Sequence, residues 1–328
     1  MTKFKVLLTR KIPKPAIDFI LENNIDLEIN TEDRVLSHTE IKEKVKGKDG
    51  LICLLTDPID AEIMDAAGAK LKVIANYAVG YNNIDVKEAT KRKIPVTNTP
   101  GVLTETTADL AFSLLLSIAR RIVESDKYTR EGKFKGWGPM LHLGNDIYGK
   151  TLGIIGCGRI GTAVARRAAK GFNMRVLYNS TKQLPELEKE LGIEFASVEE
   201  ILKQSDYVSL HVPLTPKTKH LIGEKELALM KPTAYLINTS RGSVIVEKAL
   251  VKALKEKTIA GAALDVYEFE PELSPGLKDL DNVIVTAHIG TGTIDTRTKM
   301  GMMVGENLLA ALQDRQPPNC VNAEIYEK

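Results

Sequence analysis

The chain has 328 residues, which at about 150 residues per domain predicts two domains and at least one substantial core. Hydrophobic residues make up 43% and charged residues 27% of the sequence, as is typical of globular proteins. The 45 Lys and Arg residues nearly balance the 43 Asp and Glu residues. The resulting net charge of +2 gives no reason to expect nucleic acid or an anionic membrane as a partner.

The sequence also argues against a membrane span or export. Its most apolar stretch, residues 108–119, is too short to cross a bilayer and is interrupted by three polar residues. The start of the chain lacks the long apolar region and the small-residue cleavage site of a signal peptide. Cys53, Cys157 and Cys320 lie too far apart for a disulfide framework or a thiolate metal site. We therefore expect a cytoplasmic protein with reduced cysteines and no bound metal.

Short β-type runs alternate with helical patterns along the chain, which is the signature of an α/β fold with parallel sheets. A first series of predicted strands covers residues 4–8, 26–30, 50–55, 72–77 and 95–98. A long helical pattern at 104–130, interpreted as an interdomain helix, is followed by a Gly-rich loop with the only Trp, Trp137. A second series covers residues 151–156, 174–179, 207–212, 234–239, 261–266 and 282–288. A last helix, from about 293 to 312, ends before a Gln-Pro-Pro stop signal.

The second series opens with a glycine motif that is typical of dinucleotide-binding proteins. Gly156, Gly158 and Gly161 have G-x-G-x-x-G spacing, directly after an apolar strand and at the start of an Ala-rich helix. Gly156 would permit a tight turn, Gly158 would let the backbone approach a pyrophosphate, and Gly161 would allow close helix packing. Glycine turns between strands and helices are common, but strand, motif, helix and next strand together favour a nucleotide site.

The choice between NAD and NADP depends on the end of the second strand of this unit. An Asp or Glu about 20 residues after the motif would bind the ribose 2′-hydroxyl of NAD. The sequence instead has Asn179, Ser180, Thr181 and Lys182 there, so no carboxylate would repel a 2′-phosphate. Lys182 could equally be a solvated loop lysine. The sequence favours NADP over NAD without excluding NAD.

Three further residues are candidates for catalysis because each follows an apolar strand. In a doubly wound sheet the carboxyl ends of the strands face the ligand, so Arg241, Glu270 and His288 can converge on one site. An Arg can hold a carboxylate through two hydrogen bonds, and a His can move a proton at neutral pH. A nearby carboxylate would fix the tautomer of that His.

Each candidate also has a structural interpretation. Arg241, beside a glycine, could be a turn residue in a surface ion pair, and Glu270 could be a solvated side chain in an acidic loop. His288 could be a helix cap. The combination of all three with an upstream nucleotide motif favours the catalytic interpretation.

Seven segments of the chain carry a resemblance to a known family. The segments ANYAVGYNNID (75–85), NTPGVLTETTADLAF (98–112), GIIGCGRIG (153–161), SLHVPLTPKTKHLI (209–222), LINTSRGSVI (236–245), ALDVYEFEP (263–271) and HIG (288–290) occur in order. The chain resembles the D-isomer-specific 2-hydroxyacid dehydrogenases over essentially its whole length. Its first motif and the missing strand-end carboxylate are most similar to glyoxylate/hydroxypyruvate reductases. One departure, HIGTGT in place of the commoner HIGSAT, affects small contacts near the nicotinamide.

The resemblance implies a split topology of two doubly wound domains with the active-site cleft between them. A flavodoxin-like substrate domain would comprise residues 1–100 plus 290–328, and an inserted Rossmann-like nucleotide domain would comprise residues 101–289. By similarity Arg241 would bind the substrate carboxylate and carbonyl, His288 would be the general acid and base, and Glu270 its partner. The backbone amides of Val79 and Gly80 would bind the substrate carboxylate.

The resemblance also implies a set of cofactor contacts. Arg159 and Ile160 would approach the pyrophosphate, and Val212, Pro213 and Thr218 would line the adenosine side. The residues near the phosphates or the nicotinamide would be Thr107, Thr239, Asp265 and Gly290, with Asp265 receiving the carboxamide. Trp137 is similar to a residue that such reductases offer to the site of the neighbouring subunit, so we expect a homodimer; its structural alternative is a loop anchor.

The expected activity is reversible hydride transfer from NADPH or NADH to a small 2-oxo acid such as glyoxylate or hydroxypyruvate, giving the D-2-hydroxy acid. A D-lactate dehydrogenase and a short D-3-phosphoglycerate dehydrogenase are alternatives within the family. A dinucleotide-sensing corepressor, whose output is protein binding, is an alternative of another class. A formate dehydrogenase is not expected, since Gln would stand at the position of Glu270.

Overall fold

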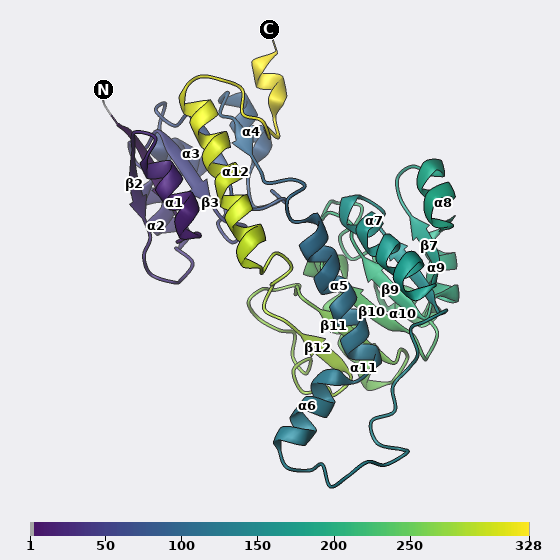
Figure 1. Cartoon of the computed structure of the whole chain (residues 1–328). Helices are drawn as coiled ribbons and strands as arrows, with labels where there is room; N and C mark the ends of the chain where they lie inside the picture. Colours follow the sequence, from purple (N-terminus) through teal and green to yellow (C-terminus); the bar gives the residue numbers. More distant parts are fainter. Residues whose placement is uncertain (1–2, 328) are drawn as a thin grey trace. The chain divides into compact units, whose positions relative to one another are not determined.

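The computed structural model describes residues 3–327, and the chain divides into two units. One unit contains both ends of the chain, up to Leu103 and from Thr291 onward. The other is the continuous segment Thr104–Gly290. Each unit is built on its own parallel sheet, as Figure 1 shows. The α/β class with parallel sheets that the sequence predicts is therefore confirmed.

The unit formed by the chain ends holds a five-stranded sheet in the order β2-β1-β3-β4-β5. This is the flavodoxin-like order, in which the direction of strand addition reverses between β1 and β3. Loops at the carboxyl ends of such strands form the ligand-binding edge of the sheet. The strands are β1 (Phe4–Leu8), β2 (Ile25–Ile29), β3 (Gly50–Cys53), β4 (Val73–Asn76) and β5 (Val96–Thr97).

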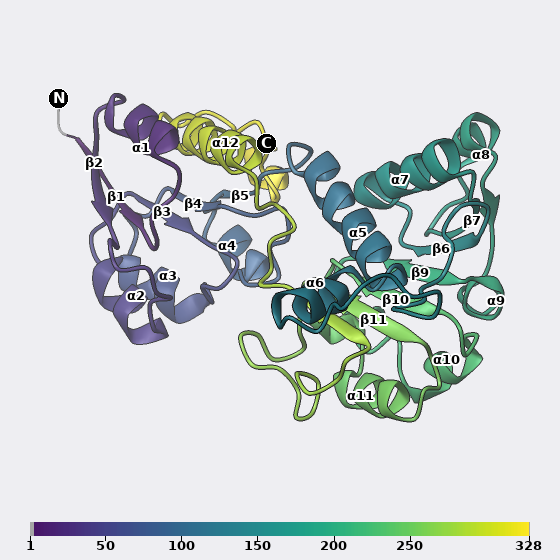
Figure 2. The same cartoon turned by 60° about the horizontal axis from the view of Figure 1, so that its bottom comes forward.

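Helices cover both faces of this sheet (Figure 2). The pair α1 and α12 lies on one face, whereas α2, α3 and α4 lie on the other, where Ile41 and Ile63 pack with Leu7 and Leu51. Parallel strands are therefore apolar on both sides, which explains their continuous apolar runs. The helices are α1 (Lys14–Leu21), α2 (His38–Lys44), α3 (Ala61–Ala67), α4 (Val86–Lys91) and α12 (Ile294–Leu312), with a short 3₁₀ helix at Ala323–Tyr326.

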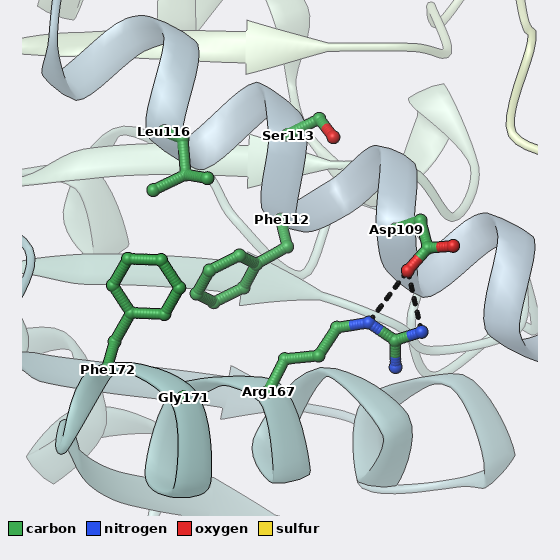
Figure 3. Close-up of a pocket in the computed structure, with 7 residues that line it drawn as sticks. All are labelled: Asp109, Phe112, Ser113, Leu116, Arg167, Gly171 and Phe172. Atoms are coloured by element: carbon green, nitrogen blue, oxygen red, sulfur yellow. Dashed lines mark hydrogen bonds and ion pairs between the residues drawn. The ribbon is translucent and has the colours of Figure 1, made fainter.

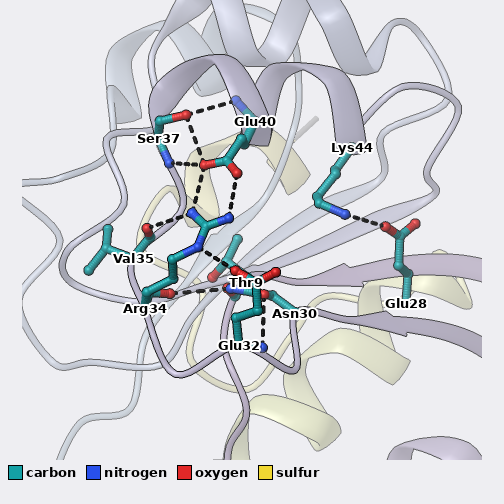
Figure 4. A network of polar contacts seen from close by, with 9 residues as sticks. All are labelled: Thr9, Glu28, Asn30, Glu32, Arg34, Val35, Ser37, Glu40 and Lys44. Atoms are coloured by element: carbon teal, nitrogen blue, oxygen red, sulfur yellow. Dashed lines mark hydrogen bonds and ion pairs between the residues drawn. The ribbon is translucent and has the colours of Figure 1, made fainter.

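The start of α2 shows how neighbouring residues fix an element in this unit (Figure 4). Ser37 Oγ accepts the N–H of Glu40, and the Glu40 carboxylate accepts the N–H of Ser37, which forms a capping box. Arg34 pairs with the same carboxylate at 2.6 Å. Hydrogen bonds from Arg34 and then from Ser37 lower the pKa of Glu40 to about 2. The cap therefore keeps its charge at neutral pH and in mild acid.

The continuous unit holds a seven-stranded sheet in the order β12-β11-β10-β9-β6-β7-β8. Counted from β6, this is the Rossmann order, and the direction of strand addition reverses between β6 and β9. The strands are β6 (Thr151–Ile155), β7 (Arg175–Asn179), β8 (Glu194–Phe195), β9 (Tyr207–Leu210), β10 (Tyr235–Asn238), β11 (Gly261–Leu264) and β12 (Val283–Val285). The edge strand β8 is not among the predicted strands, because its two exposed residues form no apolar run.

The helices of this unit also cover both faces of their sheet. One core cluster joins α5 and α7 to the strands, and a second cluster joins α9, α10 and α11 to them. The helices are α5 (Thr104–Ala119), α6 (Ile122–Arg130), α7 (Arg159–Arg166), α8 (Pro185–Leu191), α9 (Val198–Gln204), α10 (Glu224–Leu229) and α11 (Glu247–Lys255). A π-helical turn, η1 (Arg167–Gly171), extends α7, and a 3₁₀ turn, η2 (Gly242–Val244), follows β10. No helix among residues 3–327 is both long and apolar enough to cross a bilayer.

The predicted helix over 104–130 is in fact two helices, which corrects the expectation. The carbonyl of Ala119, which would continue the α-helical ladder, accepts the N–H of Asn145 at 2.8 Å. Arg121 then takes a left-handed conformation with φ 53°, and its guanidinium pairs with Glu124 at the start of α6. The chain therefore breaks between α5 and α6 because a distant loop occupies the end of α5.

Candidate functional site

In the turn between β6 and α7, each glycine of the motif has different structural surroundings. Gly156 has φ 100°, a left-handed conformation that favours glycine, and a Cβ there would lie 2.7 Å from the Val212 nitrogen. A Cβ at Gly161 would lie 2.3 Å from the Gly156 carbonyl oxygen, so α7 packs directly on the turn. A Cβ at Gly158 would meet nothing within 4 Å. The space at Gly158 is therefore open to a ligand.

This turn presents the N-terminus of α7 to that open space. Gly158 is the N-cap residue, so the amides of Arg159 and Ile160 belong to the first turn and have no helical acceptor. Arg159 is exposed, and the helix dipole adds partial positive charge. Amides, dipole and open space together fit a pyrophosphate.

The strand-end segment lies beside this turn, because the Asn179 carbonyl accepts the N–H groups of Gly156 and Cys157 at 3.0 Å each. The Asn179 side chain donates to the Ala196 carbonyl at 3.0 Å, so its amide is oriented by the residue after β8. Thr181 and Lys182 are exposed, and Ser180 is partly exposed. Among the described residues, Lys182 forms no ion pair, so its charge is available to a ligand.

The loop after β9 lies across the turn, as the close approach of Gly156 to Val212 shows. Its Thr218 hydroxyl donates to the Pro213 carbonyl at 2.5 Å and accepts the N–H of Thr215 at 2.8 Å. These bonds give the loop a fixed shape. Val212 and Pro213 thus lie next to the glycine motif, while the Thr218 hydroxyl is already bonded within its own loop.

Three buried hydroxyls in this unit, those of Thr107, Ser205 and Thr239, have no hydrogen-bond partner within residues 3–327. The Oγ1 atoms of Thr107 and Thr239 are inaccessible and unpaired within residues 3–327. A buried polar atom without a partner is destabilising, so an atom of this kind that lies beside an open site is a candidate partner for a ligand. A Cβ at Gly290 would lie 3.7 Å from Thr107 Oγ1 and 3.4 Å from Asp265 Oδ2, so these three residues are neighbours. Together with the open glycine turn, they fit a dinucleotide with a polar amide at its far end.

Asp265 has a role that the sequence does not reveal. Its carboxylate is 1% exposed and accepts the Thr286 hydroxyl at 2.6 Å and the N–H groups of Ile289 and Gly290 at 2.8 Å each. These donors flank His288 on both sides. His288 itself has φ 51°, so its backbone is held in a left-handed conformation that is unusual outside glycine. Asp265 therefore fixes the backbone from which the imidazole projects.

His288 and Glu270 form a direct pair. His288 Nδ1 lies 2.9 Å from Glu270 Oε2, and Glu270 Oε1 accepts the N–H of Tyr267 at 3.0 Å. Burial raises the pKa of Glu270, but the hydrogen bond and charge of His288, the Tyr267 amide and the Arg241 charge outweigh it and lower the pKa. Glu270 is therefore a carboxylate at neutral pH. With Nδ1 bound to it, Nε2 is left to exchange a proton with a ligand.

Arg241 completes the group. Its guanidinium donates to the Ser240 carbonyl at 2.7 Å. Burial lowers its pKa, and the opposing charge of Glu270 counters that effect. An Arg remains charged under such conditions. The structure thus brings a half-buried cation, a carboxylate and an imidazole together from the loops after β10, β11 and β12.

In the other unit, the loop after β4 presents free amides. Asn76 Nδ2 donates to the Gly80 carbonyl and Asn98 Nδ2 to the Val79 carbonyl, both at 2.8 Å. The N–H groups of Val79 and Gly80 have no acceptor among the residues that the structure describes. Asn76 and Asn98 escape sequence reasoning, although both stand at strand ends, because nothing in the sequence shows which carbonyls they bind.

A surface hollow between α5 and η1 lies apart from all of these residues. Figure 3 shows Phe112 facing Phe172, with ring centroids 4.9 Å apart, and Arg167 pairing with Asp109. None of the site residues predicted from the sequence lines it. At this hollow, the aromatic contact and the ion pair join α5 to the π-helical turn. Among residues 3–327, no cluster of three or more His, Cys, Asp or Glu side chains could hold a metal ion.

Comparisons with known proteins agree with this architecture. The family described as D-isomer specific 2-hydroxyacid dehydrogenase, NAD binding domain, matches residues 112–290. A glyoxylate reductase of Korarchaeum cryptofilum is 55% identical over 328 residues, covering 99% of this chain and 98% of that protein. The chain belongs to the D-isomer specific 2-hydroxyacid dehydrogenases, as its motifs indicate. It is a dehydrogenase with a binding domain for a nicotinamide dinucleotide.

Two solved structures illustrate the likeness. The TT0316 protein from Thermus thermophilus has a TM-score of 0.91 at 46% identity, covering 97% of this chain and 100% of that chain. An NADPH-dependent glyoxylate/hydroxypyruvate reductase from Sinorhizobium meliloti, in complex with NADP and malonate, has a TM-score of 0.86 at 31% identity. That match covers 98% of this chain and 97% of the other. The similarity therefore extends over both units.

The open space at Gly158 yields a prediction on cofactor binding. Gly158→Ala should fold normally, since its methyl group meets no atom within 4 Å. The methyl group would occupy the place of a pyrophosphate, so the dissociation constant for NADPH should rise at least about tenfold. Gly161→Ala is the contrasting variant: its Cβ clash of 2.3 Å should lower the unfolding temperature. Fluorescence titration and thermal unfolding measure the two effects, and unchanged NADPH binding in Gly158→Ala would show that the space is not the phosphate site.

Proposed function

We propose that this dehydrogenase reduces glyoxylate or hydroxypyruvate to the corresponding 2-hydroxy acid, with reversal in the oxidative direction. The observation that carries the proposal is the pairing of His288 Nδ1 with Glu270 at 2.9 Å beside the half-buried Arg241. The glyoxylate reductases among the relatives support the choice of a small 2-oxo acid. A D-lactate dehydrogenase, a short D-3-phosphoglycerate dehydrogenase and a corepressor are not favoured by these relatives.

In this proposal each residue acts on one part of a 2-oxo acid. Arg241 binds the carboxylate and polarises the carbonyl oxygen, and the amides of Val79 and Gly80 bind the carboxylate. His288 delivers a proton from Nε2 to the carbonyl oxygen, while Glu270 holds the ring through Nδ1. The bound nicotinamide cofactor supplies the hydride. Thr107, Thr239, Asp265 and Gly290 lie near its nicotinamide end.

The two units receive different duties in the same proposal. The unit with the Rossmann order, Thr104–Gly290, binds the dinucleotide, and the unit with the flavodoxin-like order is the substrate domain. We also propose a cytoplasmic location, where a reduced nicotinamide cofactor is available.

The acid and base assignment predicts the behaviour of His288→Ala. Positioned proton transfer contributes about 10² to 10⁴ to a rate, so kcat for glyoxylate reduction should fall within that range. The affinity for NADPH should stay near the wild-type value, since the ring is not placed among the cofactor contacts. Steady-state kinetics and cofactor titration test this. A kcat within about threefold of wild type would reject the assignment.

We further propose that NADP is preferred over NAD. Asn179 offers no carboxylate to repel a 2′-phosphate, and Ser180, Thr181 and the exposed Lys182 can contact it. Asn179→Asp should therefore lower kcat/KM for NADPH at least about tenfold while sparing NADH. Asn173→Asp, an exposed Asn just before the other end of β7, is the matched control and should leave the NADPH to NADH ratio unchanged. A ratio that also stays unchanged in Asn179→Asp would contradict the preference.

We also propose a homodimer that uses the segment from α6 to β6. This segment exposes several large apolar side chains, with Trp137 85%, Met140 77% and Leu143 56% accessible. So many exposed large apolar side chains in one short segment favour a protein partner, and a second copy is the proposed occupant. Trp137 would then reach the substrate site of the partner subunit.

Light scattering should accordingly give twice the 36.1 kDa mass of one chain. Met140→Glu combined with Leu143→Glu should give monomers, whereas Val35→Glu, at a 42% exposed apolar residue of the other unit, should remain dimeric. Trp137→Ala should stay dimeric and raise KM for the 2-oxo acid. A wild-type protein that is monomeric at micromolar concentration would contradict the proposal.

A further inference from the structure

A buried carboxylate outside the catalytic group holds the loop that carries Glu270. Glu247, the first residue of α11, is 3% exposed. Its Oε2 accepts the N–H of Glu268 at 2.7 Å, and its Oε1 accepts the N–H of Ser274 at 3.1 Å. Among residues 3–327 it forms no ion pair, so backbone amides provide its hydrogen bonds. The two amides lie on either side of Glu270 in the chain.

The contact between helix and loop is reciprocal. Glu268 Oε2 accepts the N–H of Glu247 at 3.0 Å and so satisfies an amide at the start of α11. The other oxygen of Glu268 lies 2.6 Å from His220 Nε2. Each carboxylate therefore binds the backbone of the other residue, which fixes the loop and the helix relative to each other within this unit.

The loop is also pressed against the segment that carries Arg241. A Cβ at Gly242 would lie 1.8 Å from the Tyr267 carbonyl carbon and 2.4 Å from the Glu268 nitrogen, so no side chain separates the two segments. The N–H of Tyr267 donates to Glu270 Oε1, and the next amide, that of Glu268, donates to Glu247. Adjacent amides of one chain segment thus bind the catalytic carboxylate and the buried one.

We propose that Glu247 is a positioning residue for the reduction: by holding the Glu268 and Ser274 amides, it sets the orientation of Glu270 toward His288 Nδ1. This inference rests on the proposed roles of Glu270 and His288. Glu247 does not touch the reacting atoms and acts only through Glu270. A shift of about 1 Å at such a group is enough to lower a rate by up to about 10².

The test is a double-mutant cycle between Glu247 and Glu270. Glu247→Gln replaces one accepting oxygen with an NH₂ group that cannot accept an amide, so the loop loses one hydrogen bond. Its kcat for glyoxylate reduction should fall about tenfold, with the NADPH dissociation constant within about twofold of wild type. Glu270→Gln should lower kcat more strongly. The double variant should be no slower than Glu270→Gln alone, because Glu247 acts through the same carboxylate.

The pH profile separates positioning from simple stabilisation. The Glu270 charge favours the protonated imidazole that reduction needs, so Glu270→Gln should move the fall in activity to lower pH. Glu247→Gln should move it in the same direction by a smaller amount. Glu272→Gln, an exposed carboxylate on the same loop, is the matched control and should keep the wild-type profile and kcat. A purely structural role for Glu247 would lower the unfolding temperature without moving the profile.

Each outcome decides one of the two proposals. A wild-type profile in Glu247→Gln, or losses that multiply in the double variant, would overturn the positioning role while leaving the role of Glu270 intact. An unchanged kcat and profile in Glu270→Gln would overturn the catalytic pairing itself. Should Glu247→Gln fail to fold, Glu247→Asp keeps the charge with a shorter reach, and the same cycle and profile apply to it.

Discussion

The carboxylate of Asp265 is the group on which the geometry of the His288 loop depends. It accepts hydrogen bonds from Thr286, Ile289 and Gly290, and so fastens the chain on both sides of His288. The left-handed backbone of His288 persists because these bonds determine it. Glu270 reaches the imidazole from the loop after the neighbouring strand. The position of the ring is therefore set by the backbone as well as by its own rotamer.

Backbone amides stabilise the buried carboxylates of this unit through hydrogen bonds. Glu247 and Asp265 are buried carboxylates whose described donors are backbone amides and one hydroxyl, with no ion pair among them. A buried charge is costly unless it is hydrogen-bonded, and these amides meet that requirement without a basic surface. Arg241 thus supplies the positive charge beside Glu270 and His288. A net charge of +2 over the whole chain is compatible with an anionic substrate for this reason.

Buried polar groups that lack a hydrogen bond are as informative as those that have one. Thr107 and Thr239 keep buried hydroxyls without partners among the described residues, and the turn at Gly158 keeps an open space. Leaving a buried hydroxyl unpaired costs about 1 to 3 kcal/mol, and a ligand that completes the hydrogen bond would remove that cost. In the same unit, the Asp265 carboxylate accepts three hydrogen bonds and the Glu247 carboxylate accepts two.

The amino-acid sequence by itself determined the α/β class, both series of strands except the edge strand β8, and the glycine motif, and it singled out Arg241, Glu270 and His288 as candidate site residues. These features depend on local patterns, namely apolar runs and the residues that directly follow them. Only the tertiary structure decided that the helix after residue 104 breaks, since Ala119 meets Asn145 across a loop. It also decided which carbonyls Asn76 and Asn98 bind and that Glu247 holds the loop of Glu270. Apart from the bond between Asn76 and Gly80, these hydrogen bonds join residues that are distant in the sequence, and packing in three dimensions selects their partners.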